Sequence, residues 1–331
     1  MAMQSRRIGR LVAAAVVLAV VIGGGAFALG IWGGVELMQA AREKGCTDPF
    51  ADTIPLPELA PATGKRVRFL VIGDTGTGST AQDRVARAAR TVCDERGCDF
   101  ALLLGDNFYP DGVSGVDDPL FRERYEKQYG PLGRPVLAVL GNHDVHNNPA
   151  PQVLYSLRSD TWRMPAYAYR FRAGPVRFFA VNTNCSLLQW HRLADRLERE
   201  SSSAAWTVTF GHHPIFSTGP HGDADAITRW YFGRYIAPHV DAYFAGHTHM
   251  LEHLRRPDSR TAHLISGAGG GSNVVGPDYE PRPSAAETPF LYGEPGFAWV
   301  EADAETFTVR FFDDQPQELY RHTVRRSDRT R

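Results

Sequence analysis

The 331-residue sequence has few cysteines, almost no net charge and no internal repeat. None of its four cysteines forms a Cys-x-x-Cys pair, which excludes a zinc site built on that spacing. A formal net charge of −1 gives no electrostatic reason to expect a nucleic-acid partner. With 43% hydrophobic residues the chain can bury a substantial core, and its length predicts one large domain or two small ones.

The few cysteines still suggest a compartment. Cys93 and Cys98 flank four residues between an expected helix and an expected strand, so we expect a local disulfide. Cys46 and Cys185 either pair with each other or stay free, and three pairings of four cysteines are possible. Disulfides of this kind are typical of proteins outside the cytoplasm.

The N-terminus contains the longest uncharged run. Residues 11–35 carry no charged side chain and follow Arg6, Arg7 and Arg10. As a helix this run would be ~37 Å long, enough for a bilayer core of ~30 Å. Residues 1–35 therefore predict either a membrane anchor or a signal segment cleaved after Ala28. Because the positive charge precedes the run, the following domain is expected outside the cytoplasm, anchored or secreted.

Residues 36–64 are rich in proline and predict a linker to one domain at 65–325. Short apolar runs rich in β-branched residues then alternate with helical spacing, which predicts a layered α/β domain. The expected strands are 67–74, 98–106, 134–144, 204–214 and 239–249, with a hairpin at 166–184 and helices at 80–93 and 186–200. The last part, at 261–269, 296–303, 306–313 and 318–324, predicts antiparallel strands, and 276–296 predicts a long loop.

Five of these strands end in glycine followed by a residue that binds metals, namely Asp74, Asp106, Asn142, His212 and His247. In α/β sheets the loops beyond the carboxyl ends of strands form the binding crevice. Carboxylate, amide and imidazole donors suit Zn, Mn or Fe. In extended backbone His247 and His249 point to the same side. So many donors would crowd one ion, whereas two ions ~3.5–4 Å apart can share them through a bridging carboxylate.

The motif order Gly-Asp-x-Gly, Gly-Asp-Asn-Phe-Tyr, Gly-Asn-His-Asp, Gly-His-His-Pro and Gly-His-x-His resembles the calcineurin-like metallophosphoesterases. Within them, residues 66–270 are similar to the small, tartrate-resistant purple acid phosphatases. The resemblance implies an α/β fold, a four-layer α/β/β/α sandwich of two mixed sheets flanked by helices. It also implies a binuclear-metal acid phosphatase that hydrolyses phosphomonoesters by metal-hydroxide attack and releases inorganic phosphate.

The first motif lacks a histidine that most of this superfamily has. The usual Asp-x-His is replaced by Asp74-Thr75-Gly76, a replacement that purple acid phosphatases share. Those enzymes supply a tyrosinate from the second motif, where Tyr109 stands here. A phenol with a free pKa of ~10 is held ionised at low pH by Fe(III) more readily than by Zn(II). The resemblance therefore predicts Fe(III) at the first metal position.

The resemblance also implies a role for each candidate residue. Fe(III) would be held by Asp74, Asp106, Tyr109 and His249, and a divalent Fe, Zn or Mn by Asp106, Asn142, His212 and His247, with Asp106 bridging. His143 and His221 match positions that contact the substrate and would supply a proton, and Asp144 is expected to orient His143.

The sequence departs from the motifs of the small family members at two positions. Small family members usually read His-Tyr-Pro and Gly-His-Asp-His, where this chain has His213 and Thr248. Neither change removes a ligand, but both alter the rim of the site.

A phosphodiesterase or nucleotide pyrophosphatase on the same fold stays open as an alternative. A non-catalytic binding protein is disfavoured because the ligand set is complete.

Overall fold

The computed structural model describes residue 46 and residues 64–200, 204–271 and 275–330. The fold described below belongs to the compact unit Asp48–Arg331. The expected anchor or signal segment at 1–35 and nearly all of the proline-rich stretch lie outside the described residues. Within the described part of the chain, no helix has the length and apolarity needed to cross a membrane.

Two seven-stranded mixed sheets form the centre of this unit. The first sheet has the order β14 (Glu318–Arg325), β13 (Thr306–Asp313), β12 (Gly296–Asp303), β1 (Arg66–Ile72), β2 (Phe100–Leu103), β3 (Val136–Ala138) and β4 (Trp162–Arg163). The second has the order β11 (Glu287–Tyr292), β9 (Leu251–Arg255), β10 (Ala262–Ser266), β8 (Ala242–Ala245), β7 (Trp206–Phe210), β6 (Val176–Ala180) and β5 (Tyr169–Ala173).

Each sheet has a parallel centre. β1, β2 and β3 run parallel in the first sheet, and β6, β7, β8 and β10 run parallel in the second. The expected hairpin β5–β6 and the antiparallel run β12–β14 are confirmed. The expectation for 261–269 was partly wrong, because β10 pairs in parallel with β8 and antiparallel with β9. The expected long loop also contains a strand, β11.

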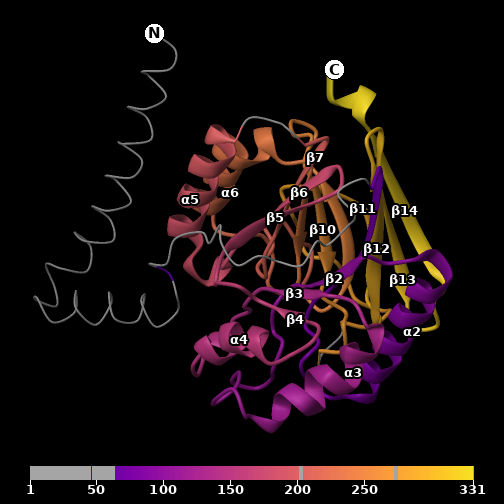
Figure 1. Ribbon diagram of the computed structural model, residues 1–331. Helices are drawn as coiled ribbons and strands as arrows, with labels where there is room; N and C mark the ends of the chain where they lie inside the picture. The colour runs from indigo at the N-terminus through magenta and orange to yellow at the C-terminus, as the bar shows by residue number, and fades with distance from the viewer. Residues whose placement is uncertain (1–45, 47–63, 201–203, 272–274, 331) are drawn as a thin grey trace, which may run out of the picture. The chain divides into compact units, whose positions relative to one another are not determined.

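The helices cover the outer faces of the sheets. α2 (Thr80–Arg96) and α3 (Lys127–Tyr129) pack with the first sheet, and α5 (Ser186–Arg199) and α6 (Ala226–Tyr231) pack with the second (Figure 1). A short helix, α4, spans Ala150–Leu154. Short 3₁₀ or π turns occupy Phe121–Glu126, Gly130–Leu132, His143–Val145, Tyr155–Leu157, Thr183–Cys185, Phe232–Ile236, Ala237–His239 and Arg326–Thr330.

The core between the sheets is rich in phenylalanine. Phe69 of β1 stacks on Phe100 of β2 at 5.2 Å and meets Phe178 of β6 edge-on at 5.2 Å. Side chains of both sheets thus interdigitate in one buried cluster, as close-packed facing sheets require. The expected four-layer α/β/β/α sandwich is confirmed.

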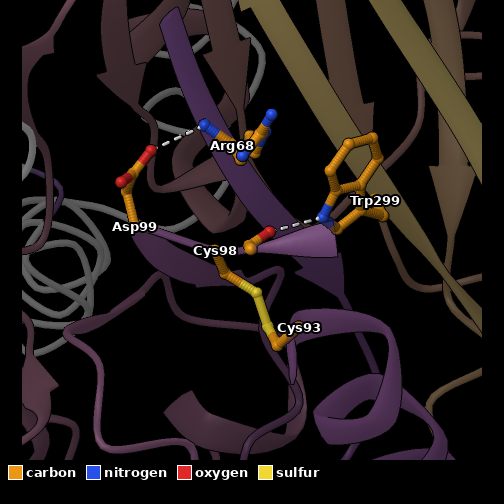
Figure 2. The surroundings of a disulfide bond; sticks show 6 residues. Arg68, Cys93, Cys98, Asp99 and Trp299 are labelled. Atoms are coloured by element: carbon orange, nitrogen blue, oxygen red, sulfur yellow. Dashed lines mark hydrogen bonds between the residues drawn. A yellow bond between two sulfur atoms is a disulfide. The ribbon is translucent and has the colours of Figure 1, made fainter. Parts of the chain in front are cut away.

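A disulfide fixes the end of α2 beside the first sheet. Cys93 and Cys98 are bonded as predicted, on either side of the turn at Gly97 (Figure 2). Trp299 Nε1 of β12 donates to Gly97 O at 3.0 Å, and Arg68 N of β1 donates to Asp99 Oδ2 at 2.7 Å. No cysteine in the described chain is free, which excludes the free-thiol alternative for Cys46 and Cys185. Such bonds suit an oxidising compartment.

Candidate metal centre

The strands that the sequence singled out end at one site. β1, β2 and β3 of the first sheet lead into the loops of Asp74, Asp106 and Asn142. β7 and β8 of the second sheet lead into those of His212 and His247. Because neighbouring strands in each set are parallel, their carboxyl ends lie at a common edge. The loops of the two sheets meet there, as the following distances show.

A first group of donors surrounds the hydroxyl of Tyr109. Tyr109 Oη donates to Asp106 Oδ2 at 2.9 Å and lies 3.3 Å from Asp74 Oδ1. His249 Nε2 lies 3.1 Å from Tyr109 Oη and 3.3 Å from Asp74 Oδ1. The four residues predicted to hold the first metal are therefore together, and Tyr109 faces the carboxylates.

A second group surrounds the amide oxygen of Asn142. His212 Nε2 and His247 Nδ1 each lie 3.0 Å from Asn142 Oδ1 and 3.2 Å from each other. His212 Nε2 is also 3.5 Å from Asp106 Oδ1. The two oxygens of Asp106 thus face different groups, Oδ2 the first and Oδ1 the second.

Hydrogen bonds orient these donors. His212 Nδ1–H donates to Leu104 O at 2.9 Å, which leaves the Nε2 lone pair for a metal. Asp74 Oδ2 accepts from His247 N at 2.9 Å, so a loop of the second sheet is tied to a ligand from the first. Asp74, Asp106 and His247 have φ angles of 59°, 52° and 66°. Non-glycine residues adopt this left-handed conformation rarely and mostly at functional sites.

Two of the glycines before the strand-end residues leave room for a neighbouring carboxylate. A Cβ at Gly246 would lie 2.5 Å from Asp74 Oδ2. A Cβ at Gly141 would overlap Asp106 Oδ1. The recurring glycine therefore permits the close approach of the loops, as the sequence pattern indicated.

The carboxylates of Asp74 and Asp106 face the hydroxyl of Tyr109, and a cation at this place would offset their negative charge. Burial, together with Asp74 and Asp106, raises the pKa of Tyr109 far above its ordinary value. Burial also raises the pKa of Asp106, but His212, His143 and the hydrogen bond from Tyr109 together outweigh it, so that pKa is lowered overall. Burial and His212 lower the pKa of His247, which keeps this imidazole neutral and able to bind a metal.

The donor set fits metal ions. Neighbouring ligands of one metal at ~2.1 Å lie about 3 Å apart, which is the spacing within each group. Asp74, Asp106 and His212 offer atoms that all lie within 4.8 Å of one another, and so do His212, His213 and His247. Carboxylate, phenol and imidazole donors in the first group are those of a hard, highly charged ion.

His143 stands beside the first group. The ring of His143 lies 4.5 Å from the ring of Tyr109, and the backbone N–H of His143 donates to Asp106 Oδ1 at 3.0 Å. Nδ1–H donates to Pro110 O at 2.6 Å, so Nε2 is the nitrogen left to meet a ligand. The expectation that Asp144 orients His143 was wrong, because the carbonyl of Pro110 does so.

Asp144 instead joins two motifs. Its carboxylate accepts from Gly141 N at 2.8 Å, Asn107 N at 3.1 Å and Phe108 N at 3.2 Å. Burial and the charge of Asp106 raise the pKa of Asp144 to about 7. The backbone amides of the loops after β2 and β3 thus share one buried carboxyl group.

His221 is exposed and lies off the strand ends, yet it reaches the site. Its ring centroid is 4.2 Å from that of His247, at an interplanar angle of 30°. The loop that carries it begins at Ser217 and Thr218, which are held by a buried glutamate. Glu252 accepts from Thr218 N at 3.0 Å and from Ser217 Oγ at 3.1 Å.

Replacing Glu252 by glutamine is expected to remove a pH dependence of stability. Burial raises the pKa of Glu252 to about 6 from an ordinary 4.5. The contribution of protonated Glu252 to the free energy of unfolding is therefore complete below pH 4.5, and it is lost as the pH rises through 6. The shift corresponds to about 2 kcal/mol. Urea unfolding should show that E252Q gains about this much relative to wild type between pH 4 and 7. Parallel pH profiles of the two proteins would refute this role.

Sequence reasoning missed Thr183, which contacts His212 and His213. Thr183 Oγ1 accepts from His212 N at 3.2 Å and from His213 N at 3.0 Å, and lies 2.8 Å from His213 Nδ1. Since that oxygen accepts both amides, its own hydrogen points to His213 Nδ1. The available signal was the polar run Asn-Thr-Asn after the apolar strand β6.

Known proteins are similar to this chain in sequence and in fold. The family model described as calcineurin-like phosphoesterase matches residues 67–251. Purple acid phosphatase 3 of Arabidopsis thaliana is 30% identical over 284 residues, which cover 76% of this chain and 75% of the relative. The chain belongs to the calcineurin-like phosphoesterases, and within them to the purple acid phosphatases. The family predicted from the motifs is thereby confirmed.

Other proteins are similar to this chain in sequence or in fold. Tartrate-resistant acid phosphatase type 5 of Homo sapiens is 27% identical, over 83% of this chain and 95% of the relative. A purple acid phosphatase, PPD1, from yellow lupin seeds shares the fold at a TM-score of 0.65 and 15% identity, over 80% of this chain and 55% of that one. GAP50, described as the anchor in the inner membrane complex of Plasmodium, has a TM-score of 0.66 at 24% identity, over 78% and 89%. The family implies a metal-dependent acid phosphatase with a binuclear centre.

Proposed function

We propose that this acid phosphatase hydrolyses phosphomonoesters at a centre of Fe(III) and a divalent Fe, Zn or Mn ion. Fe(III) is assigned to Asp74, Asp106, Tyr109 and His249, and the divalent ion to Asp106, Asn142, His212 and His247. The observation that carries the proposal is the carboxylate of Asp106, whose oxygens face one group each. That placement suits a bridging ligand.

Tyr109 supports the choice of Fe(III). Its hydroxyl lies among two carboxylates and an imidazole and, being buried there, resists ionisation. Only a strongly acidic cation at the same place offsets that cost and holds a phenolate. A divalent ion does so less readily, and the second group accordingly contains no phenol.

When bound, the metal pair neutralises charge on the phosphoryl oxygens and makes water nucleophilic at acid pH. Histidine side chains of the protein supply the proton that the leaving oxygen needs. His143 Nδ1–H is committed to Pro110 O, so its Nε2 is the atom that holds a proton for the leaving oxygen. The ring of His221 lies beside that of His247, at the second donor group, and supplies a second donor to the phosphate.

An assay of two related substrates tests this function. The full-length protein, loaded with iron and a divalent metal, is expected to hydrolyse p-nitrophenyl phosphate faster than bis-p-nitrophenyl phosphate. Activity should peak at acid pH and fall on both sides, because the nucleophile must be deprotonated and the acid protonated. Faster cleavage of the diester would favour the rival phosphodiesterase.

The same proposal includes the place of the enzyme. We assign residues 65–325 to the phosphatase domain, 36–64 to a linker and 1–35 to an anchor or cleaved signal. The domain then lies outside the cytoplasm, anchored to the membrane or secreted, in agreement with the Cys93–Cys98 disulfide. Mass measurement of the exported protein separates the two forms, since cleavage after Ala28 removes the first 28 residues.

A further inference from the structure

A cavity of about 220 Å³ opens beside the second donor group. His247 belongs both to that group and to the cavity lining. The cavity therefore begins where a substrate phosphate would be held and extends away from Tyr109 and His249. His221, which is exposed, also lines it.

One wall of the cavity is made of imidazole rings. His221 lies 4.2 Å from His247, and His213 lies 4.6 Å from it, with interplanar angles of 30° and 48°. The other wall is apolar and includes Trp190 and Ile215, both buried against α6 and its neighbours. Aromatic and apolar lining residues favour a flat ring as the ligand.

The rim of the cavity carries negative charge. Asp223 and Asp225 belong to the lining, which contains no arginine or lysine among the residues described. Hydrogen bonds from Thr228 lower the pKa of Asp225 despite the opposing effect of its partial burial, so this carboxyl group is ionised. Asp223 is paired with Arg229 at 3.0 Å, and Asp225 accepts hydrogen bonds from Ile227 N at 2.9 Å and Thr228 N at 3.0 Å at the start of α6. A second anionic group on a ligand would therefore meet two carboxylates and no cation among the lining residues described.

We propose that this cavity binds the leaving alcohol of the substrate, and that the alcohol is a compact, uncharged ring. The inference rests on the proposed function and adds a substrate class to it. A volume of about 220 Å³ accepts one ring with small substituents and lies below the usual range of pockets for drug-sized ligands. Phosphate held by the metal donors and a ring between the histidine wall and Trp190 then occupy adjoining spaces.

A matched pair of substrates tests the charge and needs no variant. The full-length, metal-loaded protein is assayed with phenyl phosphate and 4-carboxyphenyl phosphate, which differ by one carboxylate. We expect kcat/KM to be at least ~10-fold lower for the carboxylate substrate, about 1.4 kcal/mol. Equal values, or a preference for the carboxylate, would overturn the uncharged class.

A variant that fills the cavity with a larger side chain tests whether the leaving group binds there. Ala224 lines the cavity, whereas Ala226 is exposed at the start of α6 and does not. Ala224→Phe should lower kcat/KM for phenyl phosphate about 10-fold while the inhibition constant of inorganic phosphate stays within about twofold. Ala226→Phe should change neither quantity.

The outcomes separate this inference from the proposed function. If wild type hydrolyses no monoester, the proposed function fails. If wild type is active but A224F leaves phenyl phosphate turnover unchanged, or weakens phosphate to the same extent, the cavity does not hold the leaving group. The substrate pair decides the question even if A224F does not fold.

Discussion

Asp106→Ala is expected to abolish both metal binding and phosphatase activity. The carboxylate lies between the two donor groups, 2.9 Å from Tyr109 Oη and 3.5 Å from His212 Nε2. Removing it takes a ligand from each metal and the negative charge that holds the pair together. We expect kcat/KM to fall by at least ~10⁴-fold, about 5 kcal/mol of transition-state stabilisation. Metal analysis and p-nitrophenyl phosphate hydrolysis measure both effects.

Asp111→Ala is the matched control. Asp111 is an exposed carboxylate near the same loop, paired with His146 at 3.2 Å. Its loss should leave the metal content unchanged and the rate within about twofold. Two metals retained by D106A would contradict the bridging role, as would equal losses in both variants.

His143→Ala is expected to slow turnover while both metals stay bound. Its Nε2 is free to hold a proton because Nδ1–H donates to Pro110 O. Loss of a general acid typically costs ~10²–10⁴-fold in rate. The loss should be larger for phenyl phosphate than for p-nitrophenyl phosphate, because nitrophenolate departs without a proton more easily.

His146→Ala serves as its control. The exposed ring of His146 lies 5.1 Å from that of His143 and makes no contact with the donor groups in the described chain. We expect H146A to keep wild-type kcat and the same ratio between the two substrates. If H143A loses metal, or slows both substrates equally, His143 acts on the structure of the site and not on the leaving group.

Much of the site could be predicted because its signal is local. A strand that ends in Gly-Asp or Gly-His places its polar residue at the carboxyl edge of a parallel sheet, whatever the rest of the fold does. Asp74, Asp106 and His212 were found in this way, and all three lie together. The alternation of strands and helices predicted a layered α/β domain, and the family resemblance implied its four-layer arrangement.

What was missed depends on contacts between distant segments. The role of Asp144 is set by amides of the loop after β2, which lie 36 and 37 residues away along the chain. The parallel pairing of β10 with β8 requires knowing that β9 turns back beside it. The cavity beside His247 is formed by α5 and the loop that leads into α6, and no sequence motif predicts it. Such features follow from packing and not from spacing.

The visible absorption spectrum of the full-length, iron-loaded protein, recorded beside Tyr109→Phe, tests the central claim most directly. A phenolate bound to Fe(III) gives a broad visible charge-transfer band. We predict that wild type shows this band and that Y109F, which keeps the other donors, loses it. An iron-loaded wild type without colour, or an unchanged band in Y109F, would show that Tyr109 is not a ligand and that the Fe(III) assignment is wrong.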